Sequence, residues 1–446
     1  MKGDRALLVI CDGMSDQAIR ALGGKTPLEA ASTPNLDNLA EIGITGLIDP
    51  LGPGIPAGSE VGHLAIFGYD VARENPGRGT IEALGLGLKL EENTIIFRTN
   101  FATVEPKIRN EKKIIVVKDR RAGRRLSPDN LILEKAINDS LKSIQDVQMN
   151  FIATAEHRGI LILKGGDLSP HVTDSDPHQT GVSVPRVQPL TSAEDSVAAK
   201  RTAEILNIFL QRVFEILAGH EVNQRRKREG KLPANMILFR GGGSPMKIQS
   251  FEERWGMEAA CIAALPLYKG VARFLGMSIL EVEGITGYFD SNINAKIQNG
   301  ISALDKYEFV FVHIKACDVA AHDKKPDMKV KMIEKIDEAL GPLIGDVVKS
   351  EKAHIIITSD HSTSSQLGSH IADPPPILIA GPNVISDGVS AFNERATLTG
   401  GLHRVRGLDL MPLILGYTRR AIEGGLKSHP DLMRYIPRKF GPPLEL

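Results

Sequence analysis

The sequence has few cysteines. Three in 446 residues cannot form the disulfide framework of a small secreted protein, so we expect a reducing, cytoplasmic environment. Long apolar runs are also missing. The run before Asp12 is only six residues, ALLVIC, and no later run approaches the roughly 18 residues that a membrane span requires. The sequence therefore predicts neither a secretion signal nor a membrane segment.

The chain also lacks net charge, because 54 Lys and Arg residues balance 54 Asp and Glu residues. Binding to nucleic acid or to an anionic membrane through bulk charge needs a basic excess, so both partner classes are disfavoured. The length predicts about two to four domains. The sequence leaves the oligomeric state open.

Three short apolar runs each end at an aspartate: RALLVICDG (5–13), YEFVFVHIKACD (307–318) and KAHIIITSDHS (352–362). They alternate with helix-like segments, which predicts an α/β fold with a mostly parallel sheet covered by helices. If the three strands are parallel neighbours, Asp12, Asp318 and Asp360 project from the sheet edge where ligands bind. Because three carboxylates there would repel one another, the pattern predicts a metal site.

The middle of the chain breaks this pattern. A charged segment covers 107–125, an amphipathic helix is expected over 194–218, and the charged stretch 221–233 predicts a solvated loop. We therefore expect a smaller α+β domain at residues 101–255, inserted into a discontinuous core of residues 1–100 and 256–446. Within that core, helical spacing of apolar residues predicts a helix over 326–350 that starts at Pro326.

Histidines accompany the aspartates. His361 follows Asp360 directly, and His322 lies four residues after Asp318, on the same side of a helical turn. His403 lies in a glycine-bounded segment, GLHRVRG. Aspartate and histidine together suit Mn²⁺, Zn²⁺ or Co²⁺ better than Mg²⁺ or Ca²⁺ alone. Six ligands are too many for one tetrahedral ion and natural for a pair of ions.

Ser59 lies in PAGSEVGHLAIFGYD (56–70), at a glycine-flanked turn before an expected helix. One interpretation is a helix N-cap, a position that serine favours. The other is a nucleophile, because a helix N-terminus presents N–H groups to a phosphate and a deprotonated Ser59 oxygen could attack phosphorus. The two interpretations are compatible.

Several motifs follow one another along the chain: ICDGMSD, PAGSEVGH, ENPGRGTIEALG (74–85), CDVAAH, TSDHST and GLHR. In this order they resemble the cofactor-independent phosphoglycerate mutases of the archaeal type, within the alkaline phosphatase superfamily, over residues 7–404. The resemblance implies an alkaline-phosphatase-like core with two divalent ions, Mn²⁺ first and Zn²⁺, Co²⁺ or Mg²⁺ as alternatives, and no bisphosphoglycerate cofactor. It implies one ion held by Asp318, His322 and His403. It implies the other held by Asp12, Asp360, His361 and the oxygen of Ser59, which would be the nucleophile.

Three segments of the inserted domain resemble the substrate-facing segments of that family: AEHRGI (155–160), TDSDPH (173–178) and LFRGGG (238–243). The candidate residues in these segments for binding glycerate and phosphate are His157, Arg158, Asp174 and Arg240. Arginine suits this task because its planar fork pairs with carboxylate or phosphate through two bonds. Each could instead form a surface salt bridge. Lys269 of the core could neutralise phosphate or be a solvated lysine.

The resemblance implies an isomerase of glycolysis and gluconeogenesis that moves phosphate between the 3- and 2-hydroxyls of glycerate through a phosphoserine. The inserted domain would then be a substrate-binding cap that closes to exclude water. Three alternatives stay open: a phosphatase or phosphodiesterase of the same superfamily, a phosphotransferase acting on another small acceptor, and a metal-binding structural or regulatory protein without turnover.

Overall fold

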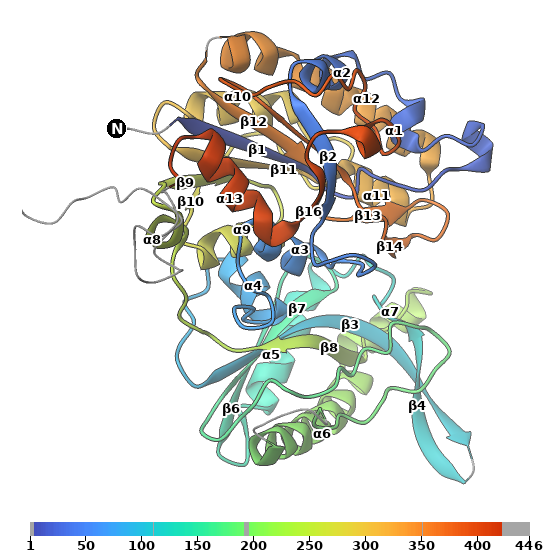
Figure 1. Ribbon diagram of the computed structural model, residues 1–446. Coiled ribbons are helices and arrows are strands. Elements are labelled where there is room, and N and C mark those ends of the chain that lie inside the picture. The colour runs from blue at the N-terminus through green and yellow to red at the C-terminus, as the bar shows by residue number, and fades with distance from the viewer. Residues whose placement is uncertain (1–3, 110, 191–195, 350, 422–446) are drawn as a thin grey trace, which may run out of the picture. The chain divides into compact units, whose positions relative to one another are not determined.

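The computed structural model describes residues 4–109, 111–190, 196–349 and 351–421 (Figure 1). The chain forms two compact units. The larger unit runs up to Asn75 and resumes at Ile248, and the smaller unit spans Pro76–Lys247. The smaller unit therefore begins at residue 76 rather than 101 and ends at 247 rather than 255. The reason for the earlier start is that α4 (Arg78–Gly85) packs on the sheet of the smaller unit.

The larger unit is built on an eight-stranded sheet with the order β10-β9-β11-β1-β12-β15-β2-β16. The three apolar runs form its centre, where β1 (Arg5–Cys11) lies between β11 (Phe309–Ile314) and β12 (Ala353–Thr358) and is parallel to both. Only β15 (Pro376–Ala380) runs antiparallel to its neighbours, β12 and β2 (Ile44–Asp49), among the strands of this sheet in the described ranges. The prediction of a mostly parallel sheet is confirmed.

Helices cover both faces of this sheet (Figure 1). Three of them contribute apolar residues to the main core on one face: α2 (Pro34–Glu41), α10 (Ile293–Ala303) and α12 (Pro326–Leu343). On the other face lie α3 (Ser59–Ile66), α9 (Pro266–Phe274) and α13 (Gly407–Tyr417).

The helix expected over 326–350 begins at Pro326, as predicted. Its α-helical part ends at Leu343, and the chain continues as a π-helical segment, η2 (Ile344–Lys349). Pro342 lies in the last turn and lacks the N–H that would continue the α-helical hydrogen-bond ladder. Residue 350 lies outside the described residues.

The remaining elements of the larger unit are short. They are η1 (Arg20–Leu22), α1 (Pro27–Ala30), α8 (Phe251–Trp255), β9 (Ala259–Ile262), β10 (Ser278–Ile279), α11 (Ala316–His322), β13 (Ser362–Ser364), β14 (Ser369–Ile371), η3 (Ala396–Thr399) and β16 (His403–Arg406). β13 and β14 form a separate antiparallel hairpin directly after β12.

The smaller unit has an antiparallel sheet of the order β4-β3-β7-β6-β5, with β8 also paired to β3. Its strands are β3 (Thr94–Arg109), β4 (Lys112–Asp119), β5 (Ser143–Ile144), β6 (Val147–Ala153), β7 (Arg158–Lys164) and β8 (Met236–Gly243). Apolar residues of α5 (Asp129–Ser140) and α6 (Ser196–Ala218) build the core on one face. This unit has the expected α+β character. Residues 194 and 195 of the predicted helix lie outside the described residues.

The segment 221–233 is not the solvated loop that its charge suggests, because it contains the helix α7 (Glu221–Arg228). Arg226 of this helix is buried. Its Nη1 donates to Asp129 Oδ2 at 3.0 Å and its Nε to the carbonyl of Leu232 at 2.9 Å. Because these partners satisfy the buried guanidinium, part of the charged stretch 221–233 can pack as a helix.

None of the helices in the described ranges combines the length and the apolar character that crossing a membrane requires. The three cysteines, Cys11, Cys261 and Cys317, are buried free thiols.

Candidate active site

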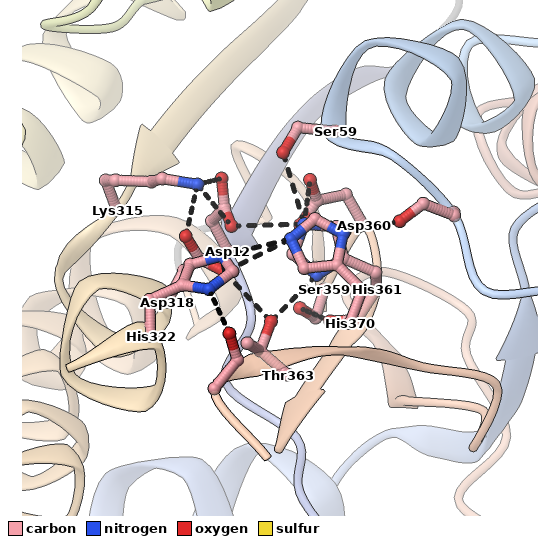
Figure 2. Close-up of polar contacts among 12 residues, drawn as sticks. Asp12, Ser59, Lys315, Asp318, His322, Ser359, Asp360, His361, Thr363 and His370 are labelled. Carbon is pink, nitrogen blue, oxygen red and sulfur yellow. Dashed lines mark hydrogen bonds and ion pairs between the residues drawn. The ribbon is translucent and has the colours of Figure 1, made fainter. Parts of the chain in front are cut away.

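Three aspartates gather at the carboxyl edge of the central strands (Figure 2). Asp12 directly follows β1, Asp360 is the second residue past β12, and Asp318 lies on α11, the helix that begins after β11. All three side chains are buried. The chain thus places three carboxylates away from water, where charge must be compensated.

Lys315 supplies part of that compensation. Its Nζ donates to both carboxylate oxygens of Asp12 at 3.0 Å and lies 2.6 Å from Asp318 Oδ2. Burial alone would raise the pKa of either aspartate, but the Lys315 ammonium holds both pKa values below their ordinary range. Sequence reasoning missed Lys315, although it lies three residues before Asp318 in the same run.

Asp12 has two further partners. The Tyr268 hydroxyl donates to its Oδ2 at 2.5 Å, and His313 Nε2 lies 2.9 Å from the same oxygen. The rings of Tyr268 and His313 stack with centroids 3.4 Å apart. These aromatic groups fix the orientation of Asp12, and no sequence motif marked them.

Three histidines converge on the aspartates. His322 Nδ1 donates to the carbonyl of Gly368 at 2.8 Å, and His370 Nδ1 donates to that of Ala57 at 2.7 Å. Because a carbonyl only accepts, both rings carry their proton on Nδ1 and present the Nε2 lone pair to the site. His361 Nε2 also faces the site, 3.3 Å from Asp360 Oδ2.

The ligand atoms fall into two overlapping groups. Those of Asp12, Asp360 and His361 lie within 4.8 Å of one another, as do those of Asp318, His361 and His370. His322 Nε2 also approaches Asp318 Oδ1, at 3.3 Å.

Neither carboxylate oxygen of the buried Asp360 has a hydrogen-bond partner among the described residues. A buried carboxylate whose oxygens accept no hydrogen bond, beside imidazole lone pairs, fits a bound divalent cation.

The prediction that His403 is a ligand does not agree with the structure. His403 is exposed on β16, beside Gly46 of β2, and lies outside both ligand groups of the described residues. Three strand spacings separate β16 from β12, which is about 14 Å.

His370 lies in one of the two ligand groups instead, because the hairpin β13–β14 folds it back against His361, with ring centroids 3.6 Å apart. The turn signal at Gly368, whose φ is +74°, could have indicated this return of the chain.

Ser59 is the first residue of α3, and the N-cap is Gly58. The N-cap interpretation of Ser59 therefore does not describe its position. Its Oγ lies 3.2 Å from His361 Nε2, which turns the side chain toward the ligands. Gly62 permits this approach, since a Cβ there would lie 2.6 Å from the carbonyl oxygen of Asp360.

His63 ties the same helix turn to the site. Its Nδ1 donates to the carbonyl of Ser59 at 2.7 Å and lies 3.3 Å from Asp360 Oδ2. Burial alone would lower the pKa of His63, but the Asp360 carboxylate raises it above its ordinary value. His63 was not among the residues singled out from the sequence, although PAGSEVGH contains it.

The substrate-binding candidates of the smaller unit lie on neighbouring strands. Arg240 of β8 is directly opposite Arg98 of β3, and Arg158 of β7 is directly opposite Asn100. Opposed residues of antiparallel strands share a face, and Arg98 and Asn100 are two residues apart, so all four share one face. It is the face on which α4 packs, opposite the main core of this unit.

Three arginines make this face basic, although Glu82 of α4 pairs with one of them, Arg98, at 2.9 Å. The pKa of His157 falls to about 4 because the ring is buried and because Arg158 and other arginines lie near it. The pKa of Arg121 is lowered by burial and by the charges of Arg124, Arg120 and Arg158. The Nε atoms of Arg158 and Arg240 are buried without a hydrogen-bond partner among the described residues. Such a cluster favours an anionic ligand.

The other two candidates have partners of their own. Asp174 Oδ1 accepts from the backbone N–H of Gly241 at 2.9 Å, and burial raises its pKa. Lys269 lies in the larger unit, where its Nζ donates to both carboxylate oxygens of Glu281, at 2.8 and 2.7 Å. Because Glu281 already neutralises its charge, the ion pair favours a structural lysine over a phosphate-binding one.

With its mostly parallel sheet and ligand-rich edge, the chain has the architecture of a metalloenzyme, and the model of the metalloenzyme superfamily matches residues 4–417. A solved structure of a Pyrococcus horikoshii protein is 35% identical, with a TM-score of 0.78, over 95% of this chain and 100% of that one. A solved cofactor-independent phosphoglycerate mutase from Thermoplasma acidophilum is 33% identical, with a TM-score of 0.63, over 93% and 100%.

Curated relatives extend this likeness. A 2,3-bisphosphoglycerate-independent phosphoglycerate mutase from Thermococcus kodakarensis is 41% identical over 95% of this chain and 100% of the relative. One from Pyrococcus horikoshii is 42% identical over 94% and 98%. The chain belongs to the family of 2,3-bisphosphoglycerate-independent phosphoglycerate mutases. The superfamily and the ligand groups together support binding of divalent metal.

Proposed function

We propose that this protein interconverts 3-phosphoglycerate and 2-phosphoglycerate without bisphosphoglycerate, as an intramolecular phosphotransferase with Ser59 as the nucleophile. The observation that carries the proposal is the position of the Ser59 hydroxyl. It lies at the first turn of α3, 3.2 Å from His361 Nε2 and directed at the ligand groups. Relatives at 41–42% identity over nearly the whole chain carry the name of this activity.

We assign the ligands to two metal positions. Asp12, Asp360, His361 and Ser59 Oγ would hold one ion, and Asp318, His322 and His370 the other. Mn²⁺ is our first choice and Zn²⁺, Co²⁺ or Mg²⁺ the alternatives, because mixed carboxylate and imidazole ligands suit borderline ions. When bound, the two ions supply positive charge that stabilises the attacking and leaving oxygens of phosphoryl transfer.

Transfer then proceeds in two balanced steps. Ser59 Oγ bonds to phosphorus while the bond from phosphorus to the glycerate oxygen breaks, and that oxygen takes up the serine proton. Glycerate turns in place, and its other hydroxyl takes the phosphoryl group back and returns a proton to Ser59. The N-terminal N–H groups of α3 favour the phosphate charge next to Ser59.

A phosphoserine that is open to water would be hydrolysed, so a mutase must retain glycerate and exclude solvent. Holding the acceptor in place can contribute about 7–11 kcal/mol to the transfer step. We assign this task to the smaller unit, as a substrate-binding cap. The shared face of Arg158 and Arg240, with His157 next to Arg158 in the chain, supports the assignment, since glycerate and its phosphate are anions.

The first test is an assay with 3-phosphoglycerate and the Mn²⁺-loaded enzyme, following both 2-phosphoglycerate and free phosphate, without added bisphosphoglycerate. We expect 2-phosphoglycerate as the main product. Ser59→Ala should keep the fold and bind Mn²⁺ but lose essentially all transfer. Substantial activity in Ser59→Ala, or a phosphoryl group found elsewhere in quenched wild type, would contradict the role of Ser59.

The main alternative is a phosphatase, and the same assay separates the two. Release of mainly free phosphate by the wild type would favour the hydrolase. The cap assignment is tested with Arg158→Ala and Arg240→Ala, which should raise the ratio of free phosphate to 2-phosphoglycerate. Arg201→Ala is the matched control, because this arginine lies on α6, away from the positive face, where it pairs with Asp146. Wild-type ratios and rates in both variants would refute the assignment.

A further inference from the structure

Thr363 is a buried residue at the ligand groups that the reaction steps leave without a role. It lies on β13, two residues after His361. Its Oγ1 is 2.9 Å from Asp318 Oδ1 and 3.0 Å from His361 Nδ1 (Figure 2). One hydroxyl therefore contacts a candidate ligand of each metal position.

The direction of these two hydrogen bonds follows from counting protons. A hydroxyl has one proton to donate, and the Asp318 carboxylate, 2.6 Å from the Lys315 ammonium, can only accept. Thr363 therefore donates to Asp318 and accepts from the Nδ1–H of His361. This tautomer leaves the Nε2 lone pair of His361 free to face Asp12 and Asp360, as metal binding requires.

The backbone holds the hydroxyl in place. The N–H of Thr363 donates to the carbonyl of Ser15 at 3.1 Å, and its carbonyl accepts from Lys329 Nζ at 2.8 Å. Lys329 is fully buried and also donates to Asp16 Oδ2 at 3.0 Å. Thr363 is, in addition, the cross-strand partner of His370 in the hairpin.

We propose that Thr363 is a positioning residue for both metal positions, fixing the tautomer of His361 and the orientation of Asp318 with one hydroxyl. The proposal rests on the two-metal centre proposed above. Removing a partner of a metal ligand typically weakens metal binding about 10–100-fold. Because Thr363 serves a ligand of each position, its loss should weaken both, whereas an ordinary ligand partner would affect only one.

The test is a calorimetric titration of the metal-free protein with Mn²⁺. Thr363→Val removes the hydroxyl with little change in size, and Thr363→Ser keeps it. The matched control is Thr358→Val, because this buried hydroxyl at the end of β12 donates instead to the carbonyl of Pro376, at 3.0 Å. Thermal unfolding in chelator reports the stability of each variant, and Thr363→Ala repeats the test if the valine variant is unstable.

We expect Thr363→Val to bind Mn²⁺ about 10–100-fold more weakly at both positions. Thr363→Ser and Thr358→Val should keep the wild-type affinities. At saturating Mn²⁺ the valine variant should recover activity with an unchanged KM for phosphoglycerate. Wild-type affinities in the valine and alanine variants, weakening at one position only, or no rescue by serine would overturn the inference. If the wild type itself bound fewer than two Mn²⁺, the proposed centre would fall together with this inference.

Discussion

Replacing Lys296 by methionine should stabilise the larger unit at neutral pH. Lys296 lies on α10, fully buried, with its Nζ donating to the carbonyl of His313 at 2.8 Å. Burial lowers its pKa from 10.5 to about 8. If the unfolded chain keeps the ordinary pKa, this difference in pKa lowers the free energy of unfolding by about 3 kcal/mol at neutral pH, because each pKa unit corresponds to about 1.4 kcal/mol.

The sign of the pH dependence follows from proton binding. Below pH 8 the ammonium is charged in both states, and the folded protein bears the full desolvation penalty. Between pH 8 and 10.5 the unfolded chain binds more protons than the folded one, so wild-type stability rises with pH. Methionine removes the penalty but also one hydrogen bond of about 1 kcal/mol. We therefore expect Lys296→Met to be about 2 kcal/mol more stable at pH 7 and nearly equal to wild type at pH 10.

The assay is urea denaturation at pH 7, 8.5 and 10, followed by the fluorescence of Trp255. This is the only tryptophan, and it is buried in the larger unit, so it reports the unfolding of that unit alone. Lys329→Met is the contrasting variant. It breaks a buried ion pair with Asp16 and should lose about 3–5 kcal/mol at each pH. A Lys296→Met protein that is less stable than wild type at pH 7, or a difference independent of pH, would refute the reasoning.

Three further predictions concern the metal centre. His370→Ala should lose one of two Mn²⁺ ions in a binding titration while His403→Ala keeps both, and the reverse result would restore His403 as a ligand. Asp360→Asn should abolish turnover without lowering the melting temperature in chelator, because it removes a buried carboxylate that accepts no hydrogen bond from the described residues; a large drop would contradict this. Chelation should abolish activity, with Mn²⁺ or Co²⁺ restoring it better than Ca²⁺, and full activity in a verified metal-free sample would exclude a metal mechanism.

Local sequence determined the elements that bear the site. The apolar runs of β1, β11 and β12 predicted buried parallel strands, and the aspartates after them predicted a common edge, because the side chains that follow parallel strands gather there. Asp318 and His322 could be placed together because a helical turn brings residues four apart to one side. Such inferences need only the spacing of residues along the chain and the assumption that the strands are parallel.

Contacts between distant segments could not be inferred in this way. His370 reaches the site because a hairpin reverses the chain. His403 is an equally plausible histidine in the sequence, but it lies on the edge strand β16, away from the site. Spacing along the chain does not reveal the order of strands across a sheet. The helix α7 was missed for the same reason, since Arg226 is buried by partners far away in the sequence.

The sequence by itself thus determined the fold class, the family resemblance, the three aspartates and Ser59, because each depends on a short pattern. Only the tertiary structure decided which histidines lie near the aspartates, that Lys315 lies between Asp12 and Asp318, and that Arg158 and Arg240 share one face of a sheet. Those facts depend on strand order, register and hairpin geometry. They arise from packing between segments that are distant in the chain, and no local pattern encodes that packing.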